Sequence, residues 1–370
     1  MPTVDIHLPH HRYTVHIGSG ILARLGDLTR GVAPHHRAAV LSDGNVEATH
    51  AARAAAALAA AGYQTVRAQL PPGEEHKTLD TVRSLYEVLL GARLERRSPV
   101  VAVGGGVTGD TAGFVAATYL RGVPLIQCPT TLLAMVDSSV GGKVGVDVPQ
   151  GKNLIGAFYQ PSLVVIDTDT LATLPARELR CGLAECIKHA VIRDAALLTW
   201  TSAHLPQILA LDPPTLVELI ERNVQIKAWV VMHDEKEAGE RAHLNFGHTF
   251  GHAIESTTGY SRYHHGEGVA LGMVAATRLA IVAGLCKPDL LATLVDLLRR
   301  TGLPVSAPGD ALPATATLME AMTLDKKVAG GRIRFILPQG PGQVTIVDNI
   351  APELVRQAWD FLRQPPALDS

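Results

Sequence analysis

Apolar and polar residues alternate at the start of the chain, which is the spacing of half-buried β-strands. Apolar residues occupy every second position in 4–8 and again in 13–17, and the polar stretch 9–12 separates the two runs. Two alternating runs joined by a short polar segment are typical of a β-hairpin. The pattern therefore predicts two antiparallel strands at the N-terminus.

Short apolar runs then alternate with helical segments up to about residue 171. Helices are expected near 46–61, up to about 91, and from 108 to 120, with short strands between them. This alternation predicts a mainly parallel sheet covered by helices. Ligands of such sheets bind beyond the carboxyl ends of the strands, where Asp43, the 104–110 turn, Thr130 and Thr131 are placed.

The pattern changes after about residue 175, where a helical spacing of apolar residues dominates. A strand hairpin is expected only near 332–347. Helices are expected at 176–192, 196–210, 214–238, 246–258, 266–284, 288–301 and 351–363. We therefore expect an α/β domain over 1–175 and a mainly helical domain over 176–370, with the boundary near Pro175.

Composition narrows the class of protein. The 370 residues are 47% hydrophobic and 18% charged, with a formal net charge of −2, so a dominant nucleic-acid or membrane-surface role has no support. No two of the four cysteines have CxxC spacing, no signal peptide is recognisable, and no uncharged apolar run is long enough to span a bilayer. We expect a cytoplasmic protein, and the sixteen histidines direct attention to metal or proton chemistry.

The segment GGGVTGD (104–110) contains G-x-G-x-x-G between a strand and a helix. Free backbone N–H groups and the helix dipole suit such a turn to phosphate. No acidic residue follows at the Rossmann distance of about twenty positions, and Asp110 would repel a phosphate but can accept a hydroxyl. A tight turn without a ligand is the alternative.

Segment 129–153 combines hydroxyl residues, Asp137, a glycine pair, Lys143 and Lys152. A loop rich in Gly and Lys can form an anion cradle, and a solvated surface loop is the alternative. Basic residues in polar contexts elsewhere can together neutralise a substrate with several negative charges, although each alone reads as a solvated charge. They are Arg121, Lys227, Arg241, Lys326 and Lys327.

Two further groups carry metal-ligand chemistry. Glu185 and Lys188 share a helix face at i, i+3, where they form either part of a cleft or a surface ion pair. His248 and His252 stand at i, i+4, a spacing that can bind zinc, and His264 and His265 open the next predicted helix. Spacing alone pairs His248 with His252, with Glu185 as the oxygen ligand. A single histidine on an apolar face is more often a core residue.

These motifs, taken in order, resemble those of the 3-dehydroquinate synthase family of sugar-phosphate cyclases. The resemblance covers residues from about 40 to 337. It is carried by PGEEHK, GGGVTGD, YLRG, PTTLLAMVDSSVGGK, GKN, GLAECIKHA, LNFGHTFGHAIE, HGEGVALGM and DKKV. It implies an N-terminal NAD-binding α/β domain, a helical C-terminal domain with a divalent zinc or cobalt ion, and a homodimer.

The resemblance also implies roles for individual residues. The metal ligands would be Glu185, His248 and His265, so that His252 becomes a proton-relay or substrate residue. Implied NAD contacts are Asp43, Asn45, Glu74, Lys77, Gly105, Gly106, Asp110, Thr130, Thr131, Asp137, Lys143, Lys152, Thr170 and Thr173. Implied substrate and catalytic residues are Arg121, Lys143, Asn153, Lys188, Lys227, Arg241, Asn245, His252 and one of Lys326 or Lys327.

Three positions depart from the family pattern: Met135, Val144 and Cys186 stand where Gln, Thr and Val are common. The implied activity is that of a phosphorus–oxygen lyase of the shikimate pathway acting on 3-deoxy-D-arabino-heptulosonate 7-phosphate. Transient oxidation by NAD, loss of phosphate, re-reduction and an intramolecular aldol reaction would give 3-dehydroquinate. The alternatives are a valiolone- or inosose-type cyclase and an iron- or zinc-dependent polyol dehydrogenase.

Overall fold

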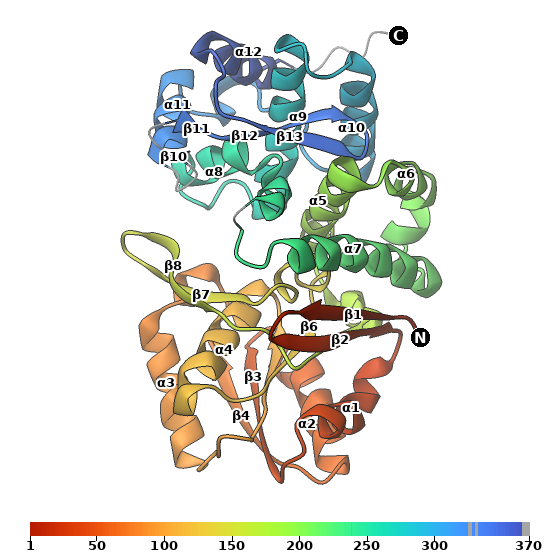
Figure 1. Ribbon diagram of the computed structural model, residues 1–370, viewed down its shortest axis with the longest axis vertical. Helices are drawn as coiled ribbons and strands as arrows, with labels where there is room; N and C mark the ends of the chain where they lie inside the picture. Colours follow the sequence, from red (N-terminus) through yellow and green to blue (C-terminus); the bar gives the residue numbers. More distant parts are fainter. Residues whose placement is uncertain (238, 325–327, 330–331, 365–370) are drawn as a thin grey trace. The chain divides into compact units, whose positions relative to one another are not determined.

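The computed structural model describes residues 1–237, 239–324, 328–329 and 332–364. They form two compact units, each considered by itself (Figure 1). The first unit contains Met1–Leu179 and Leu211–Lys236, and the second contains Arg180–Ala210 and Glu237–Ser370. This division differs from a single boundary near residue 175, because helix α7 (Pro213–His233) packs against the first two strands of the chain.

The first unit is built on a seven-stranded sheet in the order β1-β2-β9-β6-β5-β3-β4. Its first two strands form the expected antiparallel hairpin, and β2 and the remaining strands pair in parallel. The mainly parallel sheet is therefore confirmed. The strands are β1 (Thr3–Leu8), β2 (His11–Gly18), β3 (Arg37–Asp43), β4 (Gln64–Leu70), β5 (Val100–Gly104), β6 (Leu125–Pro129) and β9 (Leu163–Asp167).

Helices cover both faces of this sheet (Figure 1). Val40 and Val101 pack on one face with α1 (Leu25–Val32) and α2 (Ala52–Ala60). The next residue along β3, Leu41, faces the opposite side, where α3 (Leu79–Gly91) and α4 (Gly106–Thr118) lie. Successive side chains of a strand point to opposite faces, so continuous apolar strands bury both faces.

The segment after β6 is not the loop that its glycines and lysines suggest. A hairpin of β7 (Lys143–Val148) and β8 (Gly151–Phe158) forms a separate two-stranded sheet. Val144 and Val146 face inward and are buried, and Gly113 lets α4 approach Val144 closely. The expectation of a loop across 129–153 was wrong, because Val144 and Val146 pack on α4 and the hairpin then orders the glycines and lysines around them.

Short 3₁₀ or π turns connect these elements. They are η1 (Ile21–Arg24), η2 (Glu47–Ala51), η3 (Glu74–His76), η4 (Tyr119–Arg121), η5 (Ala134–Ser138), η6 (Thr168–Thr173), η7 (Glu240–Asn245) and η8 (Gly309–Ala311). The chain enters the second unit within α5 (Ala176–Arg193).

The second unit is mainly helical, as expected. Besides the expected hairpin of β12 (Phe335–Gly340) and β13 (Gln343–Val347), it contains a small ribbon of β10 (Val328–Ala329) and β11 (Arg332–Ile333). One helix, α11, was not expected from the sequence. The helices after α5 are α6 (Ala195–Leu209), α8 (His248–Thr257), α9 (His265–Val282), α10 (Pro288–Thr301), α11 (Thr315–Leu324) and α12 (Pro352–Leu362).

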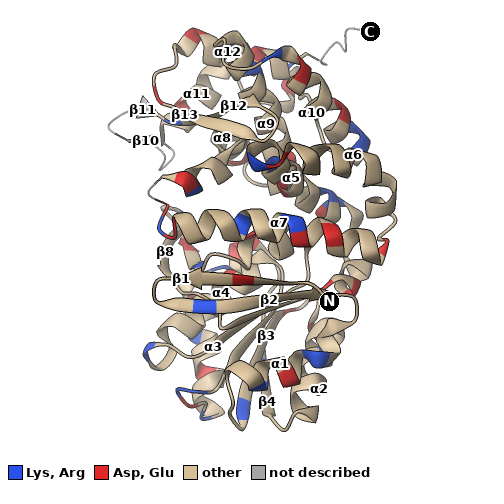
Figure 2. Cartoon of the chain, turned by 45° about the vertical axis from the view of Figure 1, so that its right-hand side comes forward, with Lys and Arg blue, Asp and Glu red and all other residues tan. Residues whose placement is uncertain are grey.

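Charged side chains are distributed without long runs of one sign along α7, where basic and acidic residues are interspersed (Figure 2). Within the described part of the chain, every helix is too short or too polar to cross a lipid bilayer.

Candidate functional site

Three helices of the second unit bring one carboxylate and two imidazoles together. Glu185 of α5 is fully buried, and its Oε1 lies 3.7 Å from Nε2 of His248 and 3.4 Å from Nε2 of His265. One ligand atom from each residue lies within 4.8 Å of the other two. Two imidazole nitrogens and a carboxylate oxygen form the donor set of a catalytic zinc site, so these residues fit a divalent cation.

The start of each helix places its histidine. Gly247, at a φ of 81°, turns the chain immediately before His248, the first residue of α8. His265 is the first residue of α9, where the Glu267 carboxylate accepts a hydrogen bond from His264 N at 2.9 Å. Such a carboxylate in the first turn stabilises a helix start. His264 is therefore a capping position, and it lies outside the group formed with Glu185.

His252 lies beside this group without joining it. Its ring centroid is 5.4 Å from that of His248, with the two rings nearly perpendicular, and 6.4 Å from that of His265. The i, i+4 pairing suggested by spacing alone is thus not the one that closes around Glu185. A residue seventeen positions along the chain, His265, takes that place because α9 packs along α8.

The charged side chains of this group stabilise one another's ionised forms. Lys188, one helical turn after Glu185, is almost fully buried and forms an ion pair with that carboxylate. Burial by itself lowers the pKa of His265, but the attraction of Glu255 and hydrogen bonds to Glu185 and Glu255 outweigh it and raise the pKa to about 10. The carboxylates of Glu185 and Glu255 thus concentrate negative charge around His265. A divalent cation bound there would neutralise that charge.

Glu255 was not singled out from the sequence. Its carboxylate is buried, and its Oε1 lies 2.8 Å from Nδ1 of His265. The only local signal was its position on α8, seven residues after His248 and therefore on the same helix face. Its partner belongs to another helix, which periodicity does not indicate.

In the first unit, several expected cofactor residues meet at the carboxyl ends of β3, β5 and β6. The Asp43 carboxylate accepts hydrogen bonds from Thr108 Oγ1 at 2.8 Å and from Asn45 N at 2.9 Å. Thr130 N donates to the carbonyl of Gly104 at 2.9 Å, and a Cβ at Gly105 would lie 3.1 Å from Thr131. The glycines thus let Thr131 pack closely on the turn at the start of α4, and the N–H groups of such a helix start suit a pyrophosphate.

A polar network around the buried Lys77 adjoins that turn. Nζ of Lys77 lies 2.6 Å from Oδ2 of Asp110 and 2.6 Å from Oδ1 of Asn153, and Lys152 pairs with Glu74 at 3.4 Å. Burial alone lowers the pKa of Lys77, but attraction to Asp110 raises it above its usual value. The ammonium therefore stays charged and donates a hydrogen bond to the Asp110 carboxyl, whose own pKa is raised by burial. That carboxyl suits a hydroxyl group rather than a phosphate.

The other expected residues are placed as follows. Lys227 of α7 forms an ion pair with Asp137 of η5 within the first unit. Thr170 and Thr173 lie in η6, where Thr173 Oγ1 is 2.7 Å from Nε2 of the buried His50. Arg121 has a positive φ of 70° in the turn after α4.

Lys143 begins β7 with an exposed side chain. In the second unit, Arg241 is buried in η7 and Asn245 donates to Glu237 Oε1 at 2.8 Å. Lys326 and Lys327 lie outside the described residues. The three departures are all in the core, since Met135, Val144 and Cys186 are buried.

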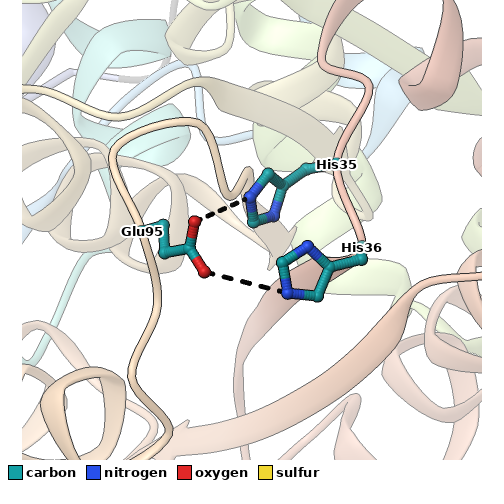
Figure 3. Close-up of side chains that lie close together, drawn as sticks. All are labelled: His35, His36 and Glu95. Atoms are coloured by element: carbon teal, nitrogen blue, oxygen red, sulfur yellow. Dashed lines mark hydrogen bonds and ion pairs between the residues drawn. The ribbon is translucent and has the colours of Figure 1, made fainter.

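A second group of side chains that could bind a metal lies at the amino ends of strands β3 and β5 of the first unit. His35 and His36 precede β3, and their Nε2 atoms lie 3.3 and 3.8 Å from the two oxygens of Glu95 (Figure 3). Arg37 shares this carboxylate at 4.0 Å, and the side chain of Glu95 is 56% exposed. A guanidinium beside a solvated carboxylate weakens its attraction for a cation, so we interpret this group as a surface ion-pair cluster.

The sequence matches two family models over adjoining ranges of residues. The one described as 3-dehydroquinate synthase N-terminal covers residues 67–181, and the one described as 3-dehydroquinate synthase C-terminal covers residues 182–328. A 3-dehydroquinate synthase of Symbiobacterium thermophilum is 48% identical over 359 residues, which are 96% of this chain and 99% of that protein.

Two solved structures are also similar over nearly the full length. ValA, a 2-epi-5-epi-valiolone synthase of Streptomyces hygroscopicus subsp. jinggangensis with NAD+ and Zn2+ bound, has a TM-score of 0.87 and 29% identity, covering 96% of this chain and 98% of its own. A 2-deoxy-scyllo-inosose synthase with carbaglucose-6-phosphate, NAD+ and Co2+ has a TM-score of 0.88 and 26% identity, covering 98% and 99%. The Glu-His-His group, the glycine turn and the 48% identity over nearly the full length lead to one conclusion: this chain belongs to the 3-dehydroquinate synthase family.

Proposed function

We propose that this protein catalyses the reaction of its family, the conversion of 3-deoxy-D-arabino-heptulosonate 7-phosphate into 3-dehydroquinate and phosphate, with NAD and a divalent metal as cofactors. The observation that carries the proposal is the group that His248 and His265 form around the buried Glu185 carboxylate, in a chain 48% identical to a 3-dehydroquinate synthase. The enzyme is then a phosphorus–oxygen lyase of aromatic amino acid biosynthesis.

The metal would be held by Glu185, His248 and His265, with zinc or cobalt as the ion, since relatives carry Zn2+ and Co2+. Such an ion supplies Lewis-acid stabilisation of a substrate alkoxide. Three protein ligands leave a position open for substrate, as in other catalytic sites. His252, with its ring beside His248, is suited to hold or relay a proton of the bound hydroxyl.

NAD would bind at the carboxyl ends of β3, β5 and β6, with its pyrophosphate on the turn at Gly105 and Gly106. NAD supplies transient oxidation of one substrate carbon and is regenerated in each turnover. Asp43 and Asp110 provide carboxylate acceptors for hydroxyl groups. The other expected contacts are Asn45, Glu74, Lys77, Thr130, Thr131, Asp137, Lys143, Lys152, Thr170 and Thr173.

Basic residues would bind the two anionic groups of the substrate. Lys143, Lys188 and Arg121 are proposed to place the phosphate, and Arg241 and Lys227 the carboxylate. Asn153, Asn245 and one of Lys326 or Lys327 complete the expected set. Such residues orient the substrate and neutralise its charges. In sites that exclude water, these two effects supply much of the rate enhancement of many enzymes.

We further propose a cytoplasmic homodimer. The four cysteines are all free thiols in the structure, which suits a reducing compartment. Strand β8 exposes three large apolar side chains: Leu154, Ile155 and Phe158 are 44%, 37% and 48% exposed. A cluster of this kind on an edge strand is typical of a surface that is covered by another protein.

The test is an incubation of the purified protein with the heptulosonate phosphate and a trace of NAD, with and without a chelator. We expect chelator-sensitive release of phosphate in large excess over the NAD supplied. NADH accumulating in proportion to substrate would instead indicate a polyol dehydrogenase. Turnover of a phosphorylated sugar without a carboxylate, but not of the heptulosonate, would indicate a valiolone- or inosose-type cyclase.

A further inference from the structure

The imidazole of His265 lies between two buried carboxylates. Its Nε2 faces Oε1 of Glu185 at 3.4 Å, and its Nδ1 lies 2.8 Å from Oε1 of Glu255. The side chain of Glu255 is 8% exposed. The two carboxylates therefore engage opposite nitrogens of one ring, and only the Nε2 side belongs to the group with His248.

Only one protonation pattern lets both contacts coexist with a bound cation. An ionised Glu255 can only accept a hydrogen bond, so Nδ1 carries the proton and Nε2 keeps its lone pair. That lone pair points towards Glu185 and His248, which is the place of a shared ion. A ligating histidine whose other nitrogen donates to a carboxylate is held in one tautomer and orientation and becomes a stronger base towards the metal.

We propose that Glu255 is a positioning residue that fixes the tautomer and orientation of His265 and thereby strengthens binding of the divalent cation. This inference rests on the proposed metal-dependent function. The contact through which it would act is the one between its carboxylate and Nδ1 of His265.

Close packing of α8 on α9 allows this contact. A Cβ at Gly268 would lie 3.1 Å from Oε1 and 3.2 Å from Cγ of Glu255, tighter than ordinary contacts. A Cβ at Gly251 would lie 3.0 Å from the carbonyl oxygen of Gly268. The two glycines thus leave the space in which a carboxylate of α8 reaches the first residue of α9, and the surrounding backbone holds Glu255 in place.

A purely structural role predicts a different result from a positioning role. If Glu255 only neutralises His265, its loss destabilises the folded protein but leaves the affinity of the folded protein for metal unchanged. If it positions the ring, metal affinity falls even where the protein is fully folded. The two roles therefore separate in a metal titration carried out on folded apoprotein.

The experiment compares wild type, Glu255→Gln and Glu255→Asp as metal-free proteins. Folding is checked by circular dichroism, and the zinc dissociation constant is measured by competition with a chromophoric chelator. Glu95→Gln is the matched control, because it removes a carboxylate that contacts a histidine in the surface cluster of Figure 3. The d–d spectrum of the cobalt-loaded proteins reports the ligand geometry independently of activity.

We expect Glu255→Gln to weaken zinc binding about 10–100-fold, the usual effect of losing such a partner, and to alter the cobalt spectrum. Glu255→Asp keeps the charge on a shorter side chain, so its zinc affinity should lie between those of Glu255→Gln and wild type. Glu95→Gln should bind zinc as wild type does. Zinc affinity within twofold of wild type in Glu255→Gln, or in Glu255→Asp should the amide variant not fold, overturns the proposal. Wild type that binds no zinc, or binds it equally well after His248→Ala, refutes the metal-dependent function itself.

Discussion

Gly272 is the position at which a single methyl group should separate the two histidine-bearing helices. It lies in the middle of α9, where α8 crosses. A Cβ there would fall inside contact distance of the Gly247 carbonyl oxygen and 2.9 Å from both the Gly247 carbonyl carbon and Gly251 N. These are backbone atoms, so no side chain can rotate away.

The size of the effect follows from these distances. Ordinary contacts between carbon atoms are about 3.5–4.0 Å, so α8 and α9 must separate by about 1 Å to accept Gly272→Ala. Overpacking of a core typically costs about 1–3 kcal/mol, and we expect the upper end because backbone meets backbone. In a domain of 150–250 residues, roughly 2–4 °C of Tm is lost per kcal/mol, which predicts a decrease of roughly 6–12 °C.

The same separation should damage the metal group. His248 begins α8 and His265 begins α9, so moving the helices apart moves the two imidazoles apart. A misplacement of about 1 Å can reduce activity about 100-fold. Calorimetry, zinc titration and phosphate release measured on one preparation would test whether stability, metal affinity and turnover fall together.

Gly31→Ala is the matched control. Gly31 lies in α1, and a Cβ there would meet nothing within 4 Å. Because Ala is favoured over Gly in a helix interior by about 1 kcal/mol, this variant should keep or slightly raise Tm. A Gly272→Ala protein with the Tm and zinc affinity of wild type would show that α8 and α9 do not pack closely at this position.

Three further predictions concern the charged residues. His248→Ala should lose both zinc and turnover, and full activity with unchanged zinc content would remove His248 from the metal group. Lys188→Ala should reduce turnover far more than NAD affinity, since Lys188 pairs with Glu185 in the second unit; equal losses in kinetics and NAD titration would contradict its proposed role. Lys77→Met should destabilise the protein by about 3 kcal/mol, because removing one partner of a buried pair leaves the charge of the other, Asp110, uncompensated. Adding Asp110→Asn should recover part of this loss of unfolding free energy, measured by denaturant unfolding. Additive losses in the double variant would argue against coupling of the two side chains.

Elements whose signals are local follow from the amino-acid sequence alone. Helix α10 occupies the residues expected, 288–301, and strand β4 (64–70) lies between two expected helices, where a short strand was predicted. Apolar periodicity and the glycine, proline and aspartate residues at element ends depend only on neighbouring positions, so one chain read in order suffices. The same holds for the turn at 104–110, where three glycines follow a fully apolar strand.

Local signals were weaker where packing decides. Val144, Val146 and Val148 alternate as a strand should, but glycines and lysines around them suggested a loop, and contact with α4 forms the hairpin β7–β8. Helix α7 follows two helices of the second unit in the chain, yet it packs on β1 and β2. The spacing of residues does not indicate the partner in either contact, because that partner is distant in the chain.

The candidate metal group shows the same limit. The sequence supplied a carboxylate and four histidines, and spacing alone chose His248 with His252, which share a helix face. Resemblance to the family implied His265 instead, and the packing of α8 on α9 brings that ring to Glu185. Glu255 was invisible in the sequence for the same reason: its partner is ten positions away on another helix. Helical periodicity reports which side chains share a face, whereas only the crossing of two helices, set here by Gly247, Gly251 and Gly272, determines which faces meet.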